Sequence, residues 1–197
     1  MTLVGYLSIQ AHANRLANLR LHEAMKVLDR SAFHAPRVGF FPSLAATLNH
    51  LLAVDLYYLG ALHGEPEGAA VFHRFVPADT VAELQQRQAA SDARLVAFCD
   101  RLDEAGCDAE VVMDRGDRVQ RDRTGHVLAH LFMHQTHHRG QAHAMLSGTA
   151  VAPPQLDEFL LPSEAHLRVP EMRAMGWREE AVYAPAPWAG SSPKHAP

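Results

Sequence analysis

Apolar side chains recur at steps of three and four residues in four long stretches of the chain. On an α-helix this spacing gathers them along one face, which packs against the apolar faces of other helices. The polar face of the third stretch, which includes Gln85, Arg87 and Asp92, is expected to face solvent. Four such helices predict an all-α protein built as a four-helix bundle. The predicted helices span about residues 3–28, 44–62, 80–105 and 124–146.

Capping residues, and a change in the spacing of apolar residues, mark the segments that connect the predicted helices. Gly106 is expected to end the third helix. Residues 109–123 place valines around Asp-Arg-Gly-Asp, which predicts a small β-hairpin that turns near Gly116, before the last bundle helix. The residues expected to cap the second, third and fourth helices are Ser43, Asp79 or Thr80, and Thr124.

The C-terminal part predicts short helices and a tail. Residues 156–161 are expected to form a helical turn, and Ser163 to cap a last helix that Pro170 shortens or kinks. The sequence therefore predicts one bundle domain over residues 1–180. The composition of residues 181–197, rich in Pro, Ala, Gly and Ser from Ala184 on, predicts a disordered tail.

The second helix is apolar nearly all round, so it is expected to be central, yet it carries His50 and Asp55. An unpaired imidazole in such surroundings costs about 1–3 kcal/mol, which a metal ion or a polar partner would remove. A hydrogen bond from His50 to a buried carboxylate such as Asp55 is one alternative. Because Asp55 falls on the leucine-lined side, we expect it to pair with Arg15 or Arg139, and only secondarily to support a metal ligand.

The fourth helix carries a stripe of histidines. His126, His130, His134 and His138 recur at every fourth residue, each turned about 40° from the last on a helix. Relative to the apolar face, His134 and His138 are expected to point into or beside the bundle interior. His126 and His130 are expected to drift towards solvent or a loop. Two imidazoles one turn apart can chelate one metal ion.

His50 supplies a third nitrogen from a different helix. Together with His134 and His138 it predicts a three-histidine metal site. Three protein ligands leave a fourth position for water or substrate, as in catalytic zinc sites. In such a site a bound water can lose its proton near neutral pH, or a thiol can be held as the thiolate.

Residues next to this pair are candidates for the pocket. His130, His137 and Gln141 are placed beside the metal or in its support. Arg139 is either a structural anchor or a site for an anionic substrate group, and the sequence leaves both open. Gly140 costs about 1 kcal/mol relative to Ala inside a helix, so we expect another helix or a second subunit to approach the backbone there.

Composition narrows the function classes. A formal net charge of −4 without a basic patch argues against a nucleic-acid or anionic-membrane partner. No apolar run of spanning length and no signal-peptide pattern is seen, so a cytoplasmic location is expected. Cys99 and Cys107 form no Cys-x-x-Cys pair and are expected to be reduced thiols without a chemical role.

Two blocks of sequence resemble the DinB family, part of the DinB/YfiT-like superfamily. They are Asn49-His50-Leu51-Leu52 with Asp55, and the run from His134 to Gln141 that ends in HHRGQ. Residues 13–16 and 156–159 fit as well, and the resemblance covers about residues 3–180. It implies an up-down-down-up bundle, a frequent homodimer, and zinc or nickel held by three histidines that match His50, His134 and His138.

The resemblance leaves the reaction open, because the superfamily includes thiol-dependent transferases and a maleylpyruvate isomerase. One hypothesis is a metal-dependent enzyme that activates a thiol or water for transfer or hydrolysis on a small substrate, in a stress-related setting. A second is a non-catalytic, stress-associated bundle in which the ion is structural. A third is a structural dimer with metal-free histidines. No motif here identifies a low-molecular-weight thiol partner.

Overall fold

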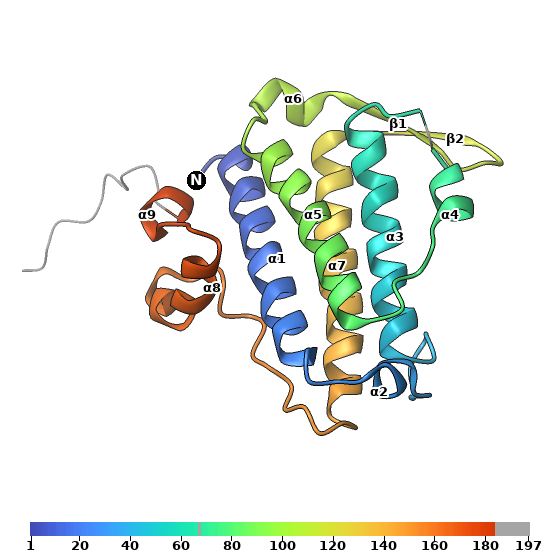
Figure 1. The fold of residues 1–197 in the computed structure, drawn as a ribbon. Helices are drawn as coiled ribbons and strands as arrows, with labels where there is room; N and C mark the ends of the chain where they lie inside the picture. Colours follow the sequence, from blue (N-terminus) through green and yellow to red (C-terminus); the bar gives the residue numbers. More distant parts are fainter. Residues whose placement is uncertain (67, 184–197) are drawn as a thin grey trace, which may run out of the picture.

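The computed structural model describes residues 1–66 and 68–183, and four long helices form its bundle (Figure 1). α1 and α7 run in one direction, and α3 and α5 run in the other, as the colours of Figure 1 show. α1 and α3 each pack against both α5 and α7. The four-helix bundle that the sequence pattern predicts is therefore confirmed, and its arrangement is the up-down-down-up one that the family resemblance implies. The helices are α1 (Leu3–Met25), α3 (Leu44–Leu62), α5 (Val81–Cys99) and α7 (Thr124–Leu146).

Side-chain caps set where three of these helices begin. The Thr2 hydroxyl accepts a hydrogen bond from the amide of Gly5 at the start of α1 (3.1 Å). Ser43 accepts from Ala46 at the start of α3 (3.0 Å), and Thr80 accepts from the first turn of α5 (3.2 Å). Each hydroxyl satisfies an amide that would otherwise have no partner in the helix. Of the two candidates for α5, Thr80 is the cap.

The prediction was wrong at two other helix ends. α5 stops at Cys99, because the Asp103 carboxylate accepts from Gly106 (2.7 Å) and starts the separate helix α6 (Glu104–Asp108). Gly106 thus lies inside a helix and does not end one. Thr124 does not cap α7, since its hydroxyl donates to the carbonyl of Ala109 (3.1 Å) and the helix begins at Thr124 itself.

The predicted hairpin is present beside the bundle. β1 (Glu110–Asp114) and β2 (Val119–Arg123) pair antiparallel, with Val112 opposite Arg121. Gly116 turns the chain at a φ of 86°, where a side chain would be strained. The hydroxyl of Tyr57 on α3 donates to the carbonyl of Asp114 (2.8 Å) and ties β1 to the bundle.

Short elements complete the described chain. Residues 156–161 contain no helix, contrary to expectation, and Pro170 stands in the first turn of α8, where the missing amide proton costs nothing. Residues 181–183 belong to α9 and so are not part of a tail. The predicted disorder of residues 184–197 lies outside the described residues. The short helices are α2 (Arg30–His34), α4 (Ala70–Arg74), η1 (Pro162–Leu167), α8 (Val169–Ala174) and α9 (Glu179–Tyr183).

The bundle interior is filled by the predicted apolar faces. Leu16, Leu52, Leu84 and Leu128, one from each long helix, are fully buried. Both cysteines are free and buried, and burial raises the pKa of the Cys99 thiol to about 12. Among the described residues, no helix combines the length and the apolar character needed to cross a membrane.

Candidate metal centre

The packing of α3 against α7 brings together three histidines that are far apart in the sequence. His50 lies in the second turn of α3, and His134 and His138 lie one turn apart on α7. Each residue offers one ring nitrogen to a group in which all three ligand atoms lie within 4.8 Å of one another. We call these three residues the histidine cluster. The one-turn spacing on α7 aligns two rings on one face, and helix packing adds the third.

The rings of the histidine cluster face one another. The Nε2 atoms of His50 and His134 lie 3.3 Å apart. The ring centroid of His138 lies 4.7 Å from that of His50 and 4.4 Å from that of His134. Zinc–nitrogen bonds are about 2.0–2.1 Å long. Small rotations of the imidazole rings would therefore bring the three nitrogens to bonding distance from one ion placed between them.

A glutamine fixes the orientation of His138. Nδ1 of His138 donates to Oε1 of Gln141 (2.8 Å), which leaves Nε2 of His138 with a free lone pair. The amide nitrogen of Gln141 donates to Nε2 of His137 (3.0 Å). Support of a ligand's second nitrogen is a usual feature of metal-binding histidines, because it selects the tautomer that binds. Gln141 and His137 thus form a chain of hydrogen bonds that ends at His138.

Burial keeps the three imidazoles neutral, as metal ligands must be. Desolvation and the neighbouring histidines, His138 first, lower the pKa of His134 to about 3. The pKa of His50 is lowered by desolvation and then by His138. Desolvation also lowers the pKa of His138, against a smaller opposing effect of Gln141. Nδ1 of His134 is buried without a hydrogen-bond partner among the described residues.

The histidine cluster is reachable on one side and covered on another. His50 and His134 are half-buried, whereas His138 is buried. The ring of Phe41, from the segment that precedes α3, lies 4.4 Å from the His50 ring and 5.6 Å from the His138 ring. An aromatic cover of this kind excludes water from part of the cluster. Sequence reasoning missed Phe41, because nothing in the pattern of a connecting segment places it over a particular helix.

The other histidines of α7 lie outside the cluster. His126 and His130 are exposed, as expected from the drift of the stripe. The His130 ring lies 6.2 Å from that of His134 and packs edge-on against Tyr58 at 5.3 Å. His130 therefore lies next to the cluster and is not one of its three members.

Asp55 belongs to a separate group in the bundle interior. Its Oδ2 accepts hydrogen bonds from Gln88 (2.7 Å) and from Gln135. The expected direct ion pair with Arg15 or Arg139 is not formed within the part of the chain that the structure describes. Gln135 instead stands between Asp55 and Arg139, because its Oε1 accepts from the guanidinium at 3.3 Å. Asp55 also forms no hydrogen bond with His50, whose ring nitrogen lies against His134 instead.

This group, which we call the polar network, joins all four long helices. Asp92 was expected in solvent but is only 3% exposed, and it accepts from Asn18 (3.0 Å) and Gln88 (3.0 Å). Burial raises the pKa of Asp92 to about 6 and lowers that of Arg139 to about 10. The pKa of Asp55 is well above its ordinary value, through burial and then the charge of Asp92. The polar network consists of Asn14, Asn18, Asp55, Gln88, Asp92, Gln135 and Arg139.

Comparisons with known proteins place the histidine cluster in context. The model of the DinB family matches residues 7–179 of this chain. The chain is also 22% identical over 154 residues to Protein DinB of Bacillus subtilis (strain 168), an alignment that covers 75% of this chain and 89% of that protein.

Proposed function

The chain belongs to the DinB family, and from that premise we propose that it is a divalent-metal-dependent enzyme whose histidine cluster binds zinc or nickel. The proposed reaction is transfer or hydrolysis on a small substrate, with a thiol or water as the activated group. The convergence of His50, His134 and His138 within 4.8 Å carries the proposal. A divalent metal held there would supply the positive charge that lowers the pKa of a coordinated thiol or water.

The surrounding residues support this use of the cluster. The lowered pKa values of His50, His134 and His138 keep lone pairs available at neutral pH. Gln141 holds His138 in one tautomer, and Phe41 shields one side of the rings. Since three nitrogens converge within the part of the chain that the structure describes, a four-coordinate ion held by them would keep one position for a small ligand.

Metal binding is tested first, by native mass spectrometry and calorimetry with Zn²⁺ and Ni²⁺. We expect one ion per chain and at least a hundredfold loss of affinity in His134→Ala, because one of three ligands is removed. His126→Ala is the matched control, since His126 is an exposed histidine on the same helix outside the cluster. Equal binding by the parent and His134→Ala would overturn the metal site.

Activity requires an open position, which cobalt substitution can report. Addition of a small thiol to the Co²⁺-loaded protein should produce a sulfur-to-metal absorption band if the thiol coordinates. A panel of thiols with electrophilic substrates, and of hydrolysable esters and amides, then tests for turnover. Turnover that requires the metal and disappears in His134→Ala supports the enzyme.

A structural ion is the second candidate, favoured by the fact that the histidine cluster joins α3 to α7. An ion there would link the two helices and stabilise the fold by mass action. This candidate predicts that chelation lowers the melting temperature and that thiols leave the cobalt spectrum unchanged. We also propose a homodimer, testable by sedimentation at several concentrations, and a stress-related role in the cytoplasm.

A further inference from the structure

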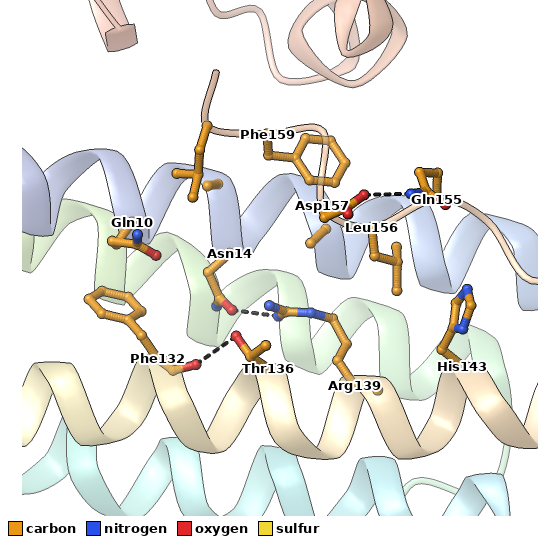
Figure 2. A pocket seen from close by; sticks show the side chains of 14 residues that line it. Gln10, Asn14, Phe132, Thr136, Arg139, His143, Gln155, Leu156, Asp157 and Phe159 are labelled. Carbon is orange, nitrogen blue, oxygen red and sulfur yellow. Dashed lines mark hydrogen bonds between the residues drawn. The ribbon is translucent and has the colours of Figure 1, made fainter. Parts of the chain in front are cut away.

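The side of α7 that faces α1 lines a cavity of about 400 Å³, a size within the range of small-molecule sites. The cavity lies between α1, α7 and the segment of residues 155–160 that crosses them (Figure 2). Its α7 residues fall within about 100° around the helix axis and so share one face, roughly opposite His134 and His138. These residues are Phe132, Thr136, Arg139, Gly140 and His143.

Most of the cavity wall is apolar. Ala13 and Ala17 of α1, Phe132 of α7, and Leu156 and Phe159 of the crossing segment surround it. Figure 2 shows the Phe159 ring beside the crossing segment and the Phe132 ring on the α7 side, at the left of the view. Such walls favour the apolar body of a ligand, since burial contributes about 25 cal/mol per Å² of apolar surface.

Arg139 adds hydrogen-bond donors to this apolar space. It is 8% exposed, lines the cavity, and reaches towards Asn14 in Figure 2. Its hydrogen bonds to described residues all leave from Nη1, to the amide oxygens of Asn14 (2.5 Å), Asn18 (2.9 Å) and Gln135 (3.3 Å). Its Nε and Nη2 groups carry the other three of the guanidinium's five N–H donors. No carboxylate of the described chain contacts this cation directly.

Asn14 adds a further donor without a partner. Its side chain is 5% exposed, and its buried amide nitrogen has no hydrogen-bond partner in the described residues. Two other polar lining residues are engaged: Thr136 donates to the Phe132 carbonyl (2.9 Å), and the His143 ring bonds to the Pro154 carbonyl (2.9 Å). The buried polar residues of the lining are Asn14 and Arg139, and their unmatched groups are donors, one of them positively charged, whereas Gln10 and Asp157 lie nearer the solvent.

We propose that this cavity binds a small organic monocarboxylate, with its carboxylate on Arg139 and Asn14 and its apolar body against Phe132, Leu156 and Phe159. A carboxylate can accept two parallel hydrogen bonds from a guanidinium. Asp157, exposed among the lining residues, accepts from Gln155 (2.6 Å) and would repel ligands of higher negative charge. The site is separate from the histidine cluster and does not depend on the proposed metal.

The test compares two probes of similar shape, 3-phenylpropionate and 3-phenylpropan-1-ol. Binding is measured by calorimetry and by saturation-transfer NMR on the full chain after exhaustive chelation, so that the carboxylate cannot be held by a metal. Gly140→Leu is the blocking variant, because Gly140 lies among the lining residues and an added Cβ there meets nothing within 4 Å. Ala129→Leu is the control, since Ala129 is exposed on the same helix outside the cavity.

We expect the carboxylate to bind at least tenfold more tightly than the alcohol, to bind at least tenfold more weakly to Gly140→Leu, and to bind equally to Ala129→Leu. Equal affinity for acid and alcohol would overturn the assignment of Arg139 and Asn14 as an anion site. Unchanged binding to Gly140→Leu would place the ligand elsewhere. Absence of binding by this and longer aryl and alkyl carboxylates in the millimolar range would overturn the proposal itself.

Discussion

The polar network and the histidine cluster are two polar groups that both include residues of α3 and α7, and they differ in how their hydrogen bonds are matched. In the polar network, amide and guanidinium donors of Gln88 and Arg139 meet oxygens of Asp55, Asp92 and two asparagines. In the histidine cluster, three neutral imidazoles present nitrogens mainly to one another.

The difference separates a group that joins the four helices from a cluster suited to a metal ion, while Asn14 and Arg139 of the network also line the cavity described above. A buried polar group whose donors and acceptors mostly match stabilises one arrangement of the helices. Clustered lone pairs without donors gain when an ion takes the space between them. The two regions should therefore respond in opposite ways to mutation: the network through folding, and the cluster through metal affinity.

The largest expected effect on folding comes from the network. Arg139→Met removes the buried guanidinium that donates to Asn14 and Asn18. The charge of this group, with that of Arg15, also favours the ionised form of Asp92, so the substitution should lower the free energy of unfolding by about 2–4 kcal/mol. The measurement is urea denaturation of the metal-free protein. Arg101→Met, at an exposed arginine, should change it by less than about 0.5 kcal/mol. His134→Ala should cost no more than about 1 kcal/mol without metal, so a larger loss there would blur the distinction between the two regions.

The polar network should also make the stability of the protein depend on pH, through Asp92. The pKa of Asp92 is raised from 3.8 to about 6 in the folded protein, so between these pH values the folded chain holds more protons than the unfolded chain. Ionisation of Asp92 therefore lowers the free energy of unfolding as pH rises from about 4 to 6, and this cost persists above that range. His22, with a pKa lowered to about 4 by burial, acts with the opposite sign in the parent and the variant alike.

Asp92→Asn removes the Asp92 contribution and also the effect of the Asp92 charge on the pKa of Asp55, and both changes act in the same direction. Between pH 4 and pH 6, the free energy of unfolding of the variant should rise relative to that of the parent by on the order of 1–3 kcal/mol, whatever the variant's stability at pH 4. Urea midpoints at intervals across this range supply the measurement. Parallel curves for the two proteins would show that Asp92 does not titrate as its burial requires.

In the histidine cluster, substitution of Gln141 should weaken metal binding and leave the stability of the fold nearly unaltered. Gln141→Leu removes the acceptor for Nδ1 of His138, so His138 can take the wrong tautomer. Loss of such support typically weakens metal binding 10–100-fold. Calorimetric titration with Zn²⁺ checks this, with Gln85→Leu on α5 as the control. If both variants bind alike, Gln141 does not act through His138.

The histidine cluster could be anticipated from sequence because its signals are local. Two of its histidines are one helical turn apart, and the third is a polar residue in an otherwise apolar helix. The polar network could not be anticipated in the same way. Asp92 lies on a helix face that reads as solvated, and Asn18 is an ordinary polar position of α1. Only the packing of four helices shows that these side chains meet, since single-helix periodicity carries no information about partners.

Helix ends were harder to predict than helix faces. Gly106 was expected to end the third helix, yet a helix can stop earlier when a nearby carboxylate, here Asp103, offers a competing cap. Thr124 has the right side chain for a cap, but the hairpin brings the Ala109 carbonyl within reach of its hydroxyl. In both cases a contact with another part of the chain, and not the residue's usual position in helices, decided where the helix began or ended.

The smallest expected effect concerns Gly140, which follows the α7 residues of both regions and lines the cavity. The sequence predicted a close approach to its backbone, but an added Cβ there meets nothing within 4 Å in the chain itself. Gly140→Ala should therefore raise the free energy of unfolding by about 0.5–1 kcal/mol, through helix propensity and a less flexible unfolded chain. Urea denaturation measures this change, and sedimentation accompanies it. A loss of stability together with dissociation of a dimer would instead mean that a second copy packs against Gly140, because the methyl group would then meet an atom that a single chain does not contain.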